Sequence, residues 1–122
     1  MSNRQITIAI DAMGGENSPF KCLKGIEIFS ARNSDVNFKI YGDEILITNS
    51  IKDNNFQINN YEIINCIENV LDDDNASTIL RSRKNSSIFK GLSFVRENSD
   101  SGFVSAGNTA ALMILSRLIL GM

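Results

Sequence analysis

Two glycine-containing loops carry the residues best suited to chemistry in this 122-residue chain. The first, Asp11-Ala12-Met13-Gly14-Gly15, directly follows a nearly continuous apolar stretch. Gly14 and Gly15 permit positive φ angles and close approach of a ligand to the backbone. Asp11 can accept hydrogen bonds from neighbouring N–H groups or from a substrate hydroxyl. We expect these three residues to shape one wall of a binding site, and a tight turn without a ligand is the alternative.

The second loop, Ser105-Ala106-Gly107-Asn108-Thr109, precedes a strongly apolar stretch that we interpret as a helix. Asn108 is well placed as the N-cap of that helix, and Gly107 removes side-chain bulk just before it. A helix start offers unpaired N–H donors and the positive end of the helix dipole, and the hydroxyls of Ser105 and Thr109 add donors. The loop predicts a site for phosphate or an acyl oxyanion, with Asn108 as the catalytic residue. A purely structural cap is the alternative, and nucleotide binding is weakly supported because neither a Walker A nor a GxGxxG motif is present.

Charged residues are concentrated in the middle of the chain. The segment Leu80–Ser87 holds three cations, of which Arg81 and Lys84 are candidates for binding phosphate or an acidic partner. A solvated charged loop is the alternative. The acidic run Asp72–Asp74 lacks the ligand spacing of a cation site, so we interpret it as a solvated loop.

The composition excludes several classes of function. The chain has no histidine, so it holds no Ser-His or Cys-His pair and no His-ligated metal. Cys22 and Cys66 lie far apart in apolar surroundings, which indicates reduced core thiols and no metal site. The net charge of -2 provides no general attraction for nucleic acid. No signal peptide is recognisable, and the apolar run Ala110–Leu115 is far shorter than the ~20 residues that span a bilayer, so we expect a cytoplasmic protein.

The elements that must position these loops alternate along the chain. Apolar, β-branched stretches predict strands, and apolar residues at helical spacing after capping residues predict helices. Ser18-Pro19 and Gly42-Asp43 provide two such helix starts, and Ser86 or Ser87 provides a third. The predicted strands are 5–10, 36–41, 61–66 and 101–105; the predicted helices are 19–32, 44–52, one ending near 97 and 109–120; and 69–87 is predicted as a loop with one helical turn. Strands that alternate with helices predict a three-layer α/β sandwich with a mostly parallel sheet.

Three motifs in this order resemble a known family. IAIDAMGGENSP, DDNASTILRSRKNSS and FVSAGNTAALM are similar to the N-terminal part of the phosphate acyltransferases, the fatty acid/phospholipid synthesis proteins PlsX. The resemblance covers nearly the whole chain. It departs from the family pattern at Glu16, Ala76, Ile79 and Ala110, where the family has Asp, Pro, Ala and Gly. Family members are far longer, so we expect residues 1–122 to be the N-terminal α/β part of a larger domain.

The resemblance implies transfer of a fatty acyl group from acyl-carrier protein to inorganic phosphate, without a cofactor. It also implies a fold similar to isopropylmalate dehydrogenase and phosphotransacetylase, a homodimer and peripheral association with the membrane. Two other functions stay open. One is a phosphotransacetylase-like or dehydrogenase-like enzyme acting on another anionic substrate, and the other is a non-catalytic fragment that assembles with a partner.

Overall fold

The predicted alternation of strands and helices is observed. The computed structural model describes residues 6–15, 17–66, 85–105 and 109–121. The strands are β1 (Ile6–Asp11), β2 (Val36–Gly42), β3 (Tyr61–Asn65) and β4 (Ser101–Val104). The helices are α1 (Phe20–Arg32), α2 (Glu44–Asp53), α4 (Ser87–Glu97) and α5 (Thr109–Leu120). The helical turn expected between residues 69 and 87 lies largely outside the described residues.

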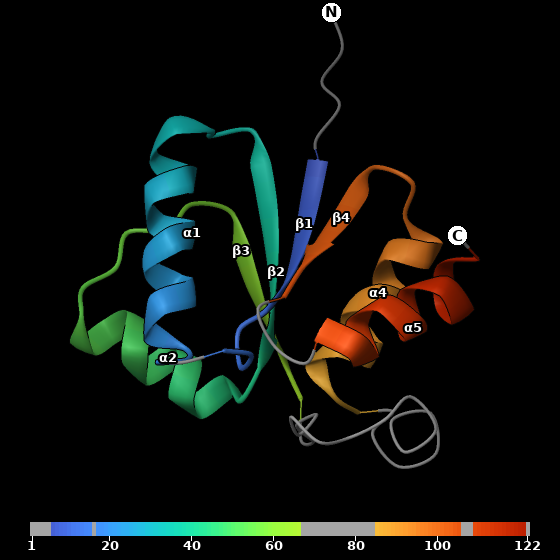
Figure 1. Ribbon diagram of the computed structural model, residues 1–122. Coiled ribbons are helices and arrows are strands. Elements are labelled where there is room, and N and C mark those ends of the chain that lie inside the picture. Colours follow the sequence, from blue (N-terminus) through green and yellow to red (C-terminus); the bar gives the residue numbers. More distant parts are fainter. Residues whose placement is uncertain (1–5, 16, 67–84, 106–108, 122) are drawn as a thin grey trace, which may run out of the picture.

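The described strands form one parallel sheet in the order β3-β2-β1-β4. Helices α1 and α2 cover one face of the sheet, and α4 and α5 lie on the other (Figure 1). Parallel neighbours need crossover connections, in which α1, α2 and α4 lie. The prediction of a three-layer α/β arrangement with a parallel sheet is therefore confirmed.

The order of the strands creates a switch point at the centre of the sheet. From β1 the chain steps outward to β2 and β3, and β4 then pairs with the opposite side of β1. The carboxyl ends of β1 and β4 lie next to each other at the point where the direction reverses. Ligands of open α/β sheets bind at such points, outside the carboxyl ends of the strands.

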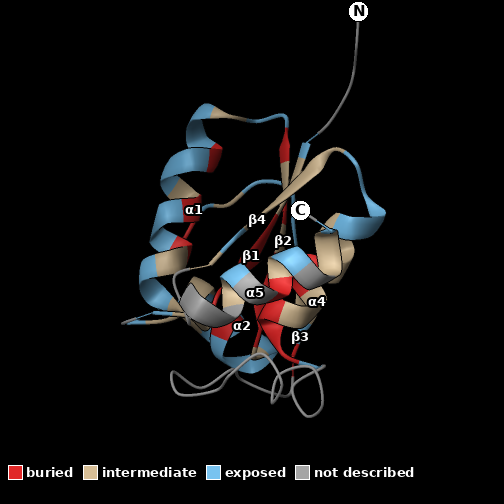
Figure 2. Cartoon of the chain, turned by 45° about the vertical axis from the view of Figure 1, so that its right-hand side comes forward, coloured by how far each residue is buried: buried red, intermediate tan, exposed pale blue. Residues whose placement is uncertain are grey.

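The core follows the alternation of side chains along the strands. On β1, Ile8 and Ile10 contribute to the cluster beneath α1, whereas Ala9 belongs to a cluster on the other face. Both faces of β1 are thus covered, as expected from its nearly continuous apolar sequence. Figure 2 shows buried residues where the helices face the sheet and exposed residues on their outer surfaces.

Two predicted helix caps are observed, and a third is wrong. The side chain of Asp43 accepts hydrogen bonds from backbone N–H groups in the first turn of α2, and Ser86 does so for α4. Ser18 does not cap α1. Instead, Pro19 occupies the N-cap position without a side-chain hydrogen bond, and the helix begins at Phe20.

Candidate functional site

Asp11 lies at the carboxyl end of β1 and is almost fully buried, with 4% of its surface exposed. It still pairs with Tyr41 of β2, so it is the last residue of the strand rather than the first residue of the loop. Its Oδ1 accepts hydrogen bonds from the backbone N–H of Met13 at 3.1 Å and from the Ser87 hydroxyl at 2.5 Å. Its Oδ2 accepts from the Ser105 hydroxyl at 2.8 Å. These donors supply the hydrogen bonds that a buried carboxylate requires.

Ser87 is a site residue that the sequence did not predict. The sequence identified Ser86 or Ser87 only as the cap of the following helix. Because Ser86 takes the capping role, Ser87 becomes the first residue of α4 and its hydroxyl reaches Asp11. No sequence signal indicates this contact, since it depends on how α4 packs against β1.

The glycine loop after β1 is closed by Ser18. The Ser18 hydroxyl donates to the carbonyl oxygens of Gly14 at 2.5 Å and Gly15 at 3.0 Å. This use of the hydroxyl explains why Ser18 does not cap α1. Gly15 has a φ of 85°, a left-handed conformation that favours glycine. The prediction that this loop uses a glycine to adopt a positive φ is therefore confirmed at Gly15.

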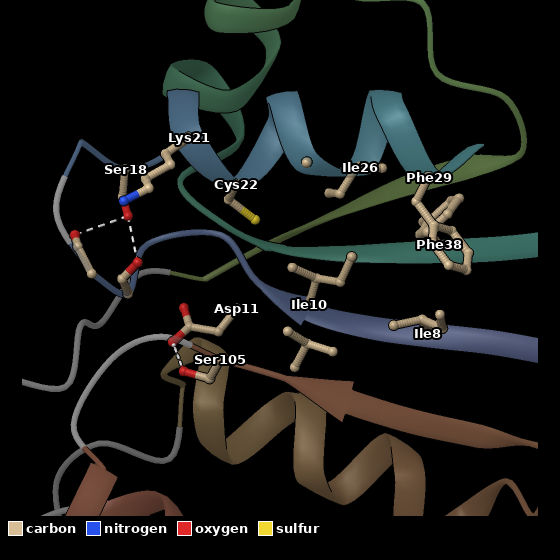
Figure 3. Close-up of a pocket in the computed structure, with 14 residues that line it drawn as sticks. Ile8, Ile10, Asp11, Ser18, Lys21, Cys22, Ile26, Phe29, Phe38 and Ser105 are labelled. Carbon is tan, nitrogen blue, oxygen red and sulfur yellow. Dashed lines mark hydrogen bonds between the residues drawn. The ribbon is translucent and has the colours of Figure 1, made fainter. Parts of the chain in front are cut away.

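Four of the predicted site residues line one pocket at the switch point (Figure 3): Asp11, Gly14, Gly15 and Ser105. The start of α5 at Thr109 is confirmed. The other predicted site residues lie outside the part of the chain that the structure describes: Arg81, Lys84, Gly107 and Asn108 entirely, and the side chain of Thr109. The structure thus places Asp11 and the glycine loop after β1 next to Ser105 at the end of β4.

The pocket has a volume of about 450 Å³ and lies between α1 and the sheet. Its polar end also contains Ser18 and Lys21, and Lys21 is the one cation among the described lining residues. The remaining lining is mainly apolar. In Figure 3 the polar side chains gather where β1 ends, and apolar side chains extend from there beneath α1.

Both cysteines are free thiols, as predicted from the sequence. Burial raises the pKa of the half-buried Cys22 to about 11, and the negative charge of Asp11 contributes to the rise. Burial likewise raises the pKa of Cys66 to about 11. A thiol with such a pKa is protonated near pH 7 and is a poor nucleophile. Cys22 therefore contributes bulk to the pocket wall.

No group of three or more acidic or cysteine side chains that could hold a metal ion is found among the described residues. Within the same part of the chain, none of the helices has the length and apolar character needed to cross a membrane.

The fold and the pocket together define an α/β protein with a candidate ligand site at the switch point of a parallel sheet. The family model described as "Fatty acid synthesis protein" matches residues 6–122. The chain therefore belongs to the fatty acid synthesis protein family, and the resemblance to the phosphate acyltransferases PlsX is confirmed.

Individual relatives support this assignment. The chain is 41% identical over 123 residues to the phosphate acyltransferase of Wolbachia pipientis wMel, covering 98% of this chain and 36% of the relative. It is 36% identical over 114 residues to the phosphate acyltransferase of Caldicellulosiruptor saccharolyticus, covering 93% of this chain and 34% of the relative. The chain thus spans about a third of the length of these curated relatives.

Proposed function

We propose that this chain forms part of a phosphate acyltransferase, which transfers a fatty acyl group from acyl-carrier protein to inorganic phosphate for phospholipid synthesis. Membership of the family supports the reaction. The observation that carries the proposed site is the hydrogen bond between Asp11 and Ser105, because it joins the glycine loop to the segment leading into α5. In the whole protein, we expect a homodimer that resides in the cytoplasm and associates peripherally with the membrane.

The chemistry places modest demands on the protein. A phosphate oxygen attacks the carbonyl carbon of the thioester, and a C–O bond forms. The C–S bond then breaks, and the thiolate of the carrier protein leaves and takes up a proton. Because phosphate is already a nucleophile and the thioester is already activated, the site must align the reactants and stabilise the developing oxyanion. No cofactor is required.

The contacts of Ser105 refine its role. Its hydroxyl proton is directed at the carboxylate of Asp11, which can only accept when ionised. That proton is then not available to phosphate, so Ser105 positions the loop. The donors for phosphate or the oxyanion come from Asn108, Thr109 and the backbone at Gly107.

The phosphate site is expected to lie slightly away from Asp11, because phosphate and the Asp11 carboxylate repel each other. Asp11 therefore acts through Ser105 and Ser87 and does not bind phosphate directly. Gly14 and Gly15 form the adjoining wall. Arg81 and Lys84 supply positive charge to phosphate or to the acidic carrier protein.

The reaction is tested by measuring acyl phosphate formed from palmitoyl-carrier protein and radiolabelled phosphate. The chain is assayed alone and together with the remaining two-thirds of a relative. We expect product in the combined sample and its loss in Asn108→Ala, with Asn49→Ala on the exposed surface of α2 as the matched control. Acetyl transfer from acetyl-coenzyme A in preference to the long-chain substrate would instead identify a phosphotransacetylase-like enzyme. Binding of the added segment without any product would overturn the proposal.

A further inference from the structure

The pocket at the switch point is graded from polar to apolar along its length. Asp11, Ser18, Lys21 and Ser105 lie at the end formed by the carboxyl edge of the sheet (Figure 3). The apolar walls come from β1, β2, α1 and β4 and include Ile8, Ile10, Ile26, Phe29, Phe38 and Val104. A ligand with a polar head and an apolar tail matches this gradient.

One face of α1 is built to leave this space open. Cys22, Gly25, Ile26 and Phe29 follow the i, i+3, i+4, i+7 spacing of a single helix face, and all of them line the pocket. A Cβ atom added at Gly25 would have no heavy-atom neighbour within 4 Å. Glycine at this position therefore does not serve close packing of the helix, and its missing side chain enlarges the pocket.

The apolar lining retains exposed hydrophobic surface. Val104 of β4 is 57% exposed, and Phe29 of α1 is 42% exposed. An apolar occupant would remove both side chains from water, which favours binding. The volume of about 450 Å³ lies within the range of small-molecule sites, roughly 300 to 1,000 Å³.

We propose that this pocket holds the hydrocarbon tail of the acyl thioester, with the reacting carbonyl at the end where Asp11 and Ser105 meet. The assignment rests on the proposed acyl transfer, because that reaction supplies a ligand with an apolar tail and a polar reacting end. The apolar pocket is also continuous with the candidate site, because Asp11 and Ser105 line its polar end. The tail then runs beneath α1, from Cys22 toward Phe29.

The test uses the purified protein and dodecanoate, whose hydrocarbon tail is the feature tested and whose carboxylate charge is offset by Lys21 at the polar end of the pocket. Gly25→Leu fills the pocket and replaces glycine with a better helix former, so α1 is expected to form. Ala31→Leu makes a similar enlargement on α1, at an exposed residue outside the pocket lining. We expect calorimetry to show at least tenfold weaker binding in Gly25→Leu and a change of less than twofold in Ala31→Leu.

Nuclear magnetic resonance on the unsubstituted protein supplies a second readout. We expect contacts between the methylene protons of dodecanoate and the methyl groups of Ile8, Ile26 and Val104. Absence of these contacts, or equal binding by Gly25→Leu, would overturn the proposal. Contacts from these methyl groups to a second protein molecule that dodecanoate does not displace would also overturn it, because protein would then fill the pocket.

The acyl phosphate assay separates this proposal from the proposed function. Dodecanoate bound in the pocket without any acyl phosphate formation would contradict the transfer reaction and leave the apolar site standing. Product formation at the same rate in Gly25→Leu and in the unsubstituted protein would contradict the pocket assignment and leave the reaction standing.

Discussion

The hydroxyl of Ser105 donates a 2.8 Å hydrogen bond to Oδ2 of Asp11, although the two residues are 94 positions apart in the chain. The other carboxylate oxygen accepts from Ser87 at the start of α4. The buried side chain of Asp11 therefore connects the ends of β1 and β4 to α4, which lies on the face of the sheet opposite α1. The two loops that carry the proposed chemistry depend on this connection for their relative position.

Asp11→Asn should lower the free energy of unfolding by about 1 to 3 kcal/mol, because an amide group replaces one acceptor oxygen and leaves a buried hydroxyl without its partner. Urea unfolding provides the measurement. The exposed Asp35 is the matched control, and Asp35→Asn should change stability little. An unchanged urea midpoint for Asp11→Asn would show that the carboxylate does not hold the loops together.

Asn108→Ala should weaken phosphate binding by about 1 to 3 kcal/mol if the side-chain amide donates to the anion. Calorimetric titration with inorganic phosphate measures the affinity, and Asn49→Ala on α2 serves again as the control. An affinity equal to that of the unsubstituted protein would reduce Asn108 to a structural helix cap.

Arg81→Ala and Lys84→Ala should weaken engagement of phosphate or the carrier protein in the full-length context. The losses should shrink as salt rises, because surface charges are screened over ~10 Å at 0.1 M ionic strength. Binding is measured at low and high salt, with the exposed Lys52→Ala of α2 as the control. Identical losses at both salt concentrations would contradict an electrostatic role.

The contacts of the Glu27 carboxylate predict that the stability of the fold depends on pH. Its carboxylate accepts a hydrogen bond from the Gln57 backbone N–H at 2.8 Å and another from Lys24 at 3.1 Å, and these contacts lower its pKa below the usual 4.5. A lowered folded-state pKa means that the contribution to stability is present above pH 4.5 and is lost as the pH falls through the lower value.

The comparison is between Glu27→Gln and the unsubstituted protein. Their difference in unfolding midpoint should be constant from pH 7 to about pH 5 and should shrink below pH 4.5. Midpoints from urea unfolding across this range decide the matter. A difference that does not change with pH would show that the charge of Glu27 is unimportant.

The 122-residue chain should self-associate or bind a partner. Leu115 of α5 is buried against Ile88 and Leu92, but Met113 on the same helix is 69% exposed. Among the described strands, β4 pairs only with β1. Leaving large apolar side chains in water forgoes roughly 1.5 to 3 kcal/mol each, so an association that covers them is favoured.

Sedimentation velocity at several protein concentrations tests this expectation. Met113→Lys should shift the chain toward monomer if the exposed face of α5 takes part. Ile45→Lys is the matched control, because Ile45 is 71% exposed on α2 in the opposite layer. A monomer that persists at all concentrations and unfolds cooperatively would show that the chain is a self-sufficient domain.

Local signals in the sequence were sufficient for the order and type of the described helices and strands. The β-branched stretch after Gly42 forms α2 because Asp43 caps its first turn, and the apolar spacing from Leu23 to Arg32 forms α1. The cap predicted at Ser18 fails for an equally local reason, since its hydroxyl finds acceptors at Gly14 and Gly15. The family was also recognisable from sequence, because three short motifs occur in the family's order and at its spacing.

By itself, therefore, the sequence determined the alternation of strands and helices, the family and the two loops, because these features depend on neighbouring residues. Only the tertiary structure decided that β4 lies beside β1, that Ser87 and Ser105 share the carboxylate of Asp11, and that an apolar pocket opens beneath α1. The physical reason is that strand order and side-chain contacts between distant segments depend on how whole elements pack. Serine looks alike in sequence whether its hydroxyl caps a helix or reaches a carboxylate across the fold.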